Sequence, residues 1–181
     1  MKETKAPAGY SLSSAVTSAT VTAGNTTNAS VTNRPQLDPI GVLVSKVDAD
    51  TNQNVAEGAG TLQGAQFTVK YYVGNYSSDP AAQGVAPTRK WVFETDADGF
   101  CYFSSAYLVS GDAFYTNSSG IPSLPLGTVT IQETKAPEGY LLNPEVYVRQ
   151  ILANGNAENV DTYNYPIIKE NSLKLDLVKK Q

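Results

Sequence analysis

Three polar side chains, Lys46, Glu133 and Asn164, have the types and spacing needed for a reaction between side chains. Lys46 alternates with valines in "GVLVSKVD", and Glu133 alternates with apolar residues in "GTVTIQE". Period-two alternation places both charged side chains on the inward face of a strand. Asn164 stands at the end of "VDTYNYP", directly before a Tyr-Pro turn. Unpaired charges are costly in a protein interior, so the pattern needs an explanation.

Two explanations are open for this trio. The structural one is a buried ion pair with a hydrogen-bonded amide. The chemical one is a reaction, because loss of water favours the neutral form of an amine and the protonated form of a carboxyl. A protonated Glu133 would polarise the carboxamide of Asn164 and transfer protons while Nζ of Lys46 attacks it. This single-turnover reaction would release ammonia and leave an amide between two side chains.

A repeated phrase indicates how the chain is organised. "ETKAPAGY" begins at Glu3 and "ETKAPEGY" begins at Glu133. An Asn-x-Pro follows each copy, with Asn33 30 residues after the first Glu and Asn164 31 residues after the second. A lysine-containing stretch comes next in both cases. The simplest interpretation is a tandem array with a period of about 130 residues.

The repeat predicts three parts. Residues 1–35 are the C-terminal tail of a preceding module, 36–168 are one complete module, and 169–181 are the first strand of a following module. The chain would then also carry incomplete sites of the neighbouring modules, which are Glu3, Asn33 and Lys179.

The elements that must position the trio are short strands. Stretches rich in β-branched and aromatic residues predict strands at 41–48, 64–73, 89–95, 100–103, 127–133, 145–152 and 160–165. Asp98-Gly99 predicts a tight hairpin turn into "FCYF". The stretches 50–63, 74–88 and 104–126 are expected to be loops, with a weak helix signal at 104–110. Short strands separated by turns predict an all-β sandwich.

The motifs resemble those of the CnaB-like domains (collagen-adhesin B-type, SpaA-type pilin) of Gram-positive surface proteins. The resemblance rests on "TVTIQETKAPEGY", on Lys46 in "SKVD" and on the Asn-x-Pro at Asn164. It implies an immunoglobulin-like β-sandwich of the reverse, CnaB type. It also implies a self-formed isopeptide bond between Lys46 and Asn164, with Glu133 as the catalytic residue. Closing a loop of that size would stabilise the fold by about 4–5 kcal/mol, by analogy with a disulfide.

Composition excludes several other classes of function. The chain has no histidine, which removes the commonest general base and the commonest metal ligand. Its net charge is −4 and it has no stripe of Lys and Arg, so a nucleic-acid partner is not expected. The single cysteine, Cys101, excludes an internal disulfide and a multi-cysteine zinc site, and we expect it in the core. No metal or cofactor is expected. No apolar run is long enough to predict membrane insertion, and any export signal would lie outside this segment.

Two classes of function remain open. The resemblance implies an extracellular protein at the cell surface, anchored to the cell wall through regions outside this segment. In the first class, the chain is a structural stalk repeat of an adhesin or pilin, and its partners are the neighbouring modules. In the alternative, it is a ligand-binding adhesin module that contacts host or cell-surface glycans or proteins through 74–88 and 104–126. Apart from the bond-forming reaction on itself, no enzyme activity is expected.

Overall fold

The computed structural model describes residues 1–174, and within them the fold is all-β, as predicted. The described part contains no α-helix, only the short 3₁₀ helix η1 (Pro80–Gln83). The strands are β1 (Leu37–Asp38), β2 (Val42–Asp48), β3 (Gln66–Tyr72), β4 (Arg89–Glu94), β5 (Phe100–Tyr102), β6 (Leu108–Gly111), β7 (Tyr115–Thr116), β8 (Pro122–Pro125), β9 (Gly127–Lys135), β10 (Val146–Ile151) and β11 (Ile167–Glu170). No helix in this part of the chain has the length and apolar character that crossing a membrane requires.

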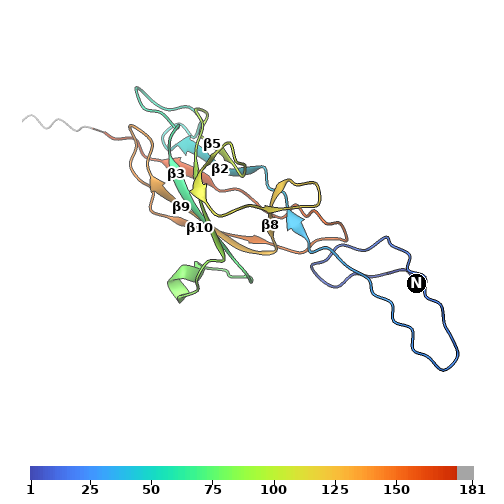
Figure 1. Cartoon of the computed structure of the whole chain (residues 1–181). Coiled ribbons are helices and arrows are strands. Elements are labelled where there is room, and N and C mark those ends of the chain that lie inside the picture. The colour runs from blue at the N-terminus through green and yellow to red at the C-terminus, as the bar shows by residue number, and fades with distance from the viewer. Residues whose placement is uncertain (175–181) are drawn as a thin grey trace, which may run out of the picture.

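Two sheets form the body of the module (Figure 1). One has five strands in the order β10-β9-β3-β4-β6, and the other has three in the order β11-β2-β5. Side chains from both sheets form one apolar cluster, to which Val44, Phe67, Trp91, Ile131 and Ile168 all belong. A third, smaller sheet, β1-β8-β7, lies where the chain enters the module. The predicted sandwich is therefore confirmed.

The first and last long strands of the module lie side by side and run in the same direction. β2 and β11 pair in parallel, with Ile168 opposite Lys46 and Glu170 opposite Asp48. Ile168 and Glu170 are fully buried on β11, whereas the residues that alternate with them are exposed. The inner face of β11 is therefore directed at the same core that receives Lys46.

The closing strand begins later than predicted. Residues 160–165 do not form a strand, because the Asp38 carboxylate accepts hydrogen bonds from the backbone N–H groups of Thr162 (2.7 Å) and Tyr163 (2.9 Å). Those donors are therefore not available for a ladder between strands. β11 starts only after Pro166, and it extends to residue 170, two residues past the predicted boundary at 168.

Two other expectations were wrong in detail. The stretch 104–126 is not a free loop, because it contributes β6, β7 and β8 to the sheets. Asp98 and Gly99 do form a tight turn, and Gly99 has a φ of 74°. The strands on either side of this turn lie in different sheets, however, since β4 pairs with β3 and β6 while β5 pairs with β2. The turn carries the chain from one layer to the other.

Candidate functional site

Lys46 and Glu133 meet in the interior, as the alternation predicted. Both side chains are completely shielded from solvent, and Nζ of Lys46 hydrogen-bonds Oε1 of Glu133. A second carboxyl group, that of Glu170, lies on the other side of the amine, with its Oε1 2.8 Å from Nζ. The site therefore consists of one amine between two carboxyl groups. We call Lys46, Glu133 and Glu170 the buried trio.

Three strands supply the buried trio. Lys46 on β2 and Glu170 on β11 belong to the three-stranded sheet, and Glu133 on β9 reaches them from the five-stranded sheet. The centre of the Phe67 ring lies 5.3 Å from Nζ of Lys46, so the amine is bounded by apolar surface as well as by carboxylates. Oε2 of Glu133 accepts a hydrogen bond from the backbone N–H of Asn143 (2.7 Å), which fixes the direction of the carboxyl group.

Glu170 has the least satisfied side chain of the three. Both of its carboxyl oxygens are buried, and neither has a hydrogen bond of acceptable geometry within the described chain, despite the short contact with the amine. Burial raises the pKa of Glu170 to about 7, against the opposing attraction of Lys46. With all three groups ionised the site would hold net negative charge in a dry interior, which is unfavourable. A protonated Glu170 relieves that charge.

The structure does not bring Asn164 to the buried trio. Asn164 is exposed, and its backbone carbonyl accepts a hydrogen bond from Nε of Arg149 (2.8 Å). The register places Ile168 opposite Lys46, so Asn164 lies four residues earlier, before the strand begins. The expected pairing of Lys46 with Asn164 therefore disagrees with this geometry. The reason is the late start of β11.

The structure describes two of the three residues predicted to belong to incomplete sites of neighbouring modules. Lys179 lies outside the described residues. Glu3 and Asn33, by contrast, are in direct contact, with Nδ2 of Asn33 2.6 Å from Oε2 of Glu3. Both are only partly buried. The backbone N–H of Ser13 also donates to Glu3 (2.8 Å), ten residues along the chain, as Asn143 donates to Glu133.

The backbone contacts of the two copies correspond position by position. In the first copy, Tyr10 forms a β-bridge with Pro35, and the N–H of Ser11 donates to the carbonyl of Arg34 (2.8 Å). In the second copy, Tyr140 forms a β-bridge with Ser172, and the N–H of Leu141 donates to the carbonyl of Asn171 (2.9 Å).

This correspondence identifies the residue that the sequence pattern missed. Asn33 directly precedes Arg34, and Glu170 directly precedes Asn171. Glu170 is therefore the structural counterpart of Asn33. The Asn-x-Pro at Asn164 has the same sequence pattern as the one at Asn33, but the backbone pairing shows that the two do not occupy equivalent positions. A signal was present in the sequence: the alternation in "IIKE" puts Glu170 on the same face as Ile168.

The repeated phrase positions Glu133 through its closing tyrosine. The hydroxyl of Tyr140 donates to Oδ2 of Asp48 (2.9 Å) and accepts from the N–H of Glu57 (3.1 Å). Burial opposes ionisation of Asp48, but the hydrogen bonds from Thr51 and Tyr140 keep its pKa below the usual value. Asp48 ends β2, so the phrase ties the end of β9 to the strand that carries the lysine.

No other group of residues in the described part of the chain offers a clear reaction centre. Cys101 is buried in the core, as expected, and burial raises the pKa of its thiol, which keeps it protonated. Carboxylate oxygens of Asp48, Asp50 and Glu57 come within 4.8 Å of one another. Those of Asp48 already accept hydrogen bonds, and Asp50 pairs with Lys174 (2.8 Å).

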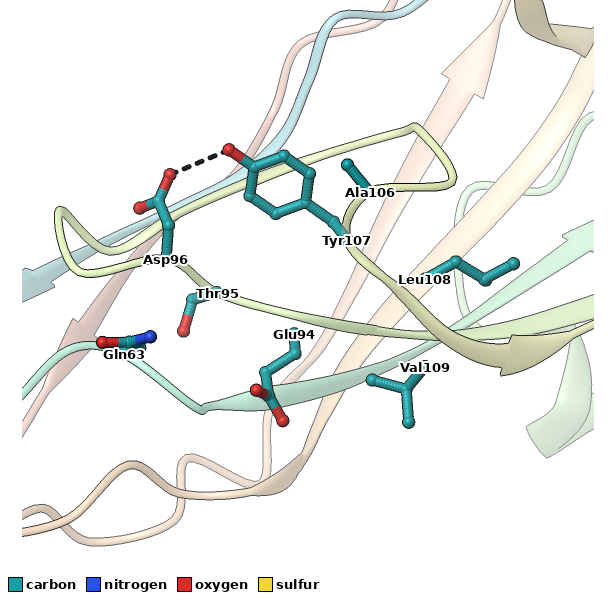
Figure 2. A pocket seen from close by; sticks show the side chains of 8 residues that line it. All are labelled: Gln63, Glu94, Thr95, Asp96, Ala106, Tyr107, Leu108 and Val109. Atoms are coloured by element: carbon teal, nitrogen blue, oxygen red, sulfur yellow. Dashed lines mark hydrogen bonds between the residues drawn. The ribbon is translucent and has the colours of Figure 1, made fainter.

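A surface hollow beside β4 is separate from the buried trio (Figure 2). Its lining includes Glu94, Asp96, Tyr107 and Val109. The Tyr107 hydroxyl donates to Oδ2 of Asp96 (3.0 Å), the contact drawn in Figure 2. These two groups satisfy each other and fasten the turn after β5 to the end of β4. The polar contact in the hollow therefore has a structural role.

Comparisons with known proteins agree with this architecture. Residues 41–166 match the family described as "SpaA: Prealbumin-like fold domain". Among solved structures, the Bacillus anthracis TIE protein is 26% identical with a TM-score of 0.55, and the match covers 95% of this chain and 24% of that one. This chain thus spans about a quarter of that structure. No curated protein sequence matches the chain.

Two pilus proteins are more distant in structure. A streptococcal ancillary pilin is 22% identical with a TM-score of 0.37, over 95% of this chain and 40% of its own. The group B streptococcus pilus 2b backbone protein is 21% identical with a TM-score of 0.36, over 81% of this chain and 47% of its own.

Proposed function

This chain belongs to the SpaA family of prealbumin-like fold domains, and on that premise we propose that it is a load-bearing stalk segment of a Gram-positive cell-surface protein. In this proposal the strands β2 and β11 are joined covalently through Lys46, with Glu133 as the catalytic residue. A cell-surface location is supported by the names of two of the similar structures, a pilin and a pilus backbone protein. Its partners would be neighbouring modules of the same protein.

The observation that carries the proposal is the parallel pairing of β2 with β11 around a buried lysine. Tension along a stalk enters the module before β2 and leaves it after β11. Because these strands run in the same direction, that tension shears one against the other. A covalent link between them would carry the load past the intervening chain, which is roughly 400 Å long when extended.

The arrangement of the site supports bond formation. The amine and its neighbouring carboxyl groups are fully buried and held at contact distance, and such positioning can remove much of the barrier of a condensation. The resulting loop spans more than 100 residues, and closing it would stabilise the fold by about 5 kcal/mol. The module would gain this stapling without an oxidant, which suits a chain with one cysteine.

The ends and insertions of the module also favour a stalk. The N-terminal segment leaves the body of the sandwich at one end, and the described chain leaves near the opposite end (Figure 1). The long insertion 104–126, which a ligand-binding module would use as a free loop, is instead bound into the sheets as β6, β7 and β8. Both observations fit a repeat that transmits force along its length.

The test is the intact mass of the 181-residue chain together with its extension under force. We expect a mass below that calculated from the sequence by one molecule of ammonia or of water. In single-molecule pulling from the two termini, the module should add no unfolding length, whereas Lys46→Ala should release roughly 400 Å. A wild-type chain that has its full sequence mass and extends like the variant would contradict the proposal.

A further inference from the structure

We infer that the acyl partner of Lys46 is the side chain of Glu170, so that the crosslink is a Lys–Glu amide formed with loss of water. The inference rests on the proposed function, since it names the second residue of the proposed bond. The sequence pattern had indicated an asparagine as this partner, and its reaction would release ammonia. Here the partner is a carboxylic acid instead. The two alternatives give products that differ in mass and in the peptides that are joined.

Contact geometry is the first argument. Oε1 of Glu170 lies 2.8 Å from Nζ of Lys46, with both side chains fully buried. The contact does not have the angles of a hydrogen bond, and among residues 1–174 neither oxygen of Glu170 has another partner. A carboxyl group that served only to stabilise the fold would be expected to have its hydrogen bonds satisfied. This one is instead buried without a hydrogen bond in the described part of the chain, and its one close polar contact is with a nucleophile.

Strand register is the second argument. Glu170 and Ile168 share the inner face of β11, and Ile168 is directly opposite Lys46. The lysine side chain is long enough to reach the next inward position along the neighbouring strand. Asn164 has no such access, because it is exposed and precedes the strand.

The first copy of the repeat gives the third, independent argument. There the side chain in contact with the glutamate of the repeated phrase is that of Asn33. The bridges Tyr10–Pro35 and Tyr140–Ser172 align that asparagine with Glu170. The position that holds a carboxamide in one copy therefore holds a carboxyl group in the other.

The charges of the site favour the condensation. One ammonium and two carboxylates in a dry interior leave one negative charge without compensation. Because burial shifts the pKa of Glu170 to about 7, its neutral acid form is populated near neutral pH. Conversion of Lys46 and Glu170 to an amide removes two ionisable groups from the interior.

The reaction balances as a simple condensation. The neutral amine of Lys46 attacks Cδ of the protonated Glu170, and a C–N bond forms. Glu133, which hydrogen-bonds the amine, accepts a proton from nitrogen and delivers it to the departing hydroxyl group. The C–O bond breaks and water leaves. No oxidant, reductant or further reactant is required, and Glu133 returns to its initial protonation state.

High-resolution intact-mass analysis of the full chain tests the assignment, followed by tandem mass spectrometry of a proteolytic digest. We expect the wild type to lack one water and to give a branched peptide that joins Lys46 to Glu170. Glu170→Gln, which keeps the length of the side chain, should lose ammonia instead and give the same product. Glu170→Ala should retain its full mass. Asn164→Ala should behave as the wild type does.

The outcomes separate this inference from the proposed function. Loss of ammonia from the wild type that disappears in Asn164→Ala would overturn the assignment to Glu170 and leave the covalent stalk standing. Full mass in the folded wild type would overturn both, even if Glu170→Gln reacts, because the native carboxyl group would then be an ionic partner only. Circular dichroism of each variant establishes that it is folded.

Discussion

The N-terminal segment 1–35 and the β-sandwich contain the same phrase in two different states. In both copies the N–H of the closing tyrosine donates to the proline carbonyl three residues earlier, from Tyr10 to Pro7 (3.1 Å) and from Tyr140 to Pro137 (3.2 Å). The tyrosines then differ in their surroundings. Tyr140 is 5% exposed, whereas Tyr10 is 43% exposed.

The difference arises from the strand that carries the lysine. The module supplies β2, so Tyr140 can bond Asp48 and Glu133 can contact Lys46. The N-terminal segment has no such strand within the described chain, and Glu3 binds only Asn33 and the N–H of Ser13. The local sequence is therefore sufficient for the turn and for the contact between the glutamate and the acceptor. Burial of the glutamate, on which the proposed reaction depends, requires β2.

The largest effect is expected from Lys46→Met, which makes the site of the module resemble that of the N-terminal segment. The variant cannot form the crosslink and leaves two facing carboxyl groups without a cation. We expect the free energy of unfolding to fall by about 5 kcal/mol from the lost loop closure alone. Chemical denaturation and trypsin digestion measure this.

Lys169→Met is the matched control for that variant, because Lys169 lies on the exposed face of β11, directly before Glu170. It should unfold as the wild type does. Equal stability of Lys46→Met and Lys169→Met would contradict stabilisation of the fold by a crosslink at Lys46.

Next in size is Glu133→Gln, which keeps the shape of the site but removes the proton carrier. We expect a folded protein in which the crosslink forms at least about 100-fold more slowly, within the range that general acid–base catalysis contributes. A time course of intact mass after refolding follows the reaction. The same change in the other copy, Glu3→Gln, should leave the rate unaltered. Bond formation at the wild-type rate in Glu133→Gln would show that Glu133 only positions the amine.

The sequence was sufficient to predict the fold class and the burial of two residues of the candidate site. Period-two alternation is a local property, so the inward direction of Lys46 and Glu133 followed directly from the residues around them. The proposed acceptor depends on where the last strand begins, and that is decided by a distant contact. Asp38 binds the backbone at Thr162 and Tyr163, which delays the strand. Sequence spacing alone does not contain this information.

A pH dependence of intermediate size should separate the module from the N-terminal segment. In Glu133→Gln without the crosslink, Glu170 still titrates, with a folded pKa of about 7 in the native site against an ordinary value of 4.5. Because the folded state holds the proton more tightly, this stabilisation is present in full below pH 4.5 and is lost as the pH rises through 7. For the native pKa this loss would be about 3 kcal/mol, and we expect a smaller loss in the variant, because the charge of Glu133 helps to raise the pKa of Glu170.

Urea denaturation of Glu133→Gln at several pH values measures this loss, and Glu133→Gln combined with Glu170→Gln is the control. The double variant lacks the titrating carboxyl group, so its stability should change less over the same window. An identical pH profile in both proteins would assign the titration to another group.

The smallest effect should come from the two tyrosines, which compare the copies most directly. Tyr140→Phe removes the hydroxyl that bonds Asp48 and leaves a buried carboxylate oxygen without that donor. We expect a loss of about 1–3 kcal/mol in the free energy of unfolding. Tyr10→Phe alters an exposed side chain and should change that free energy by less than about 0.5 kcal/mol. Thermal unfolding of both variants, with the crosslink intact, gives the comparison. Equal changes in the free energy of unfolding would mean that the phrase contributes through its turn alone. The hydrogen bond from Tyr140 to Asp48 on β2 would then add nothing to stability.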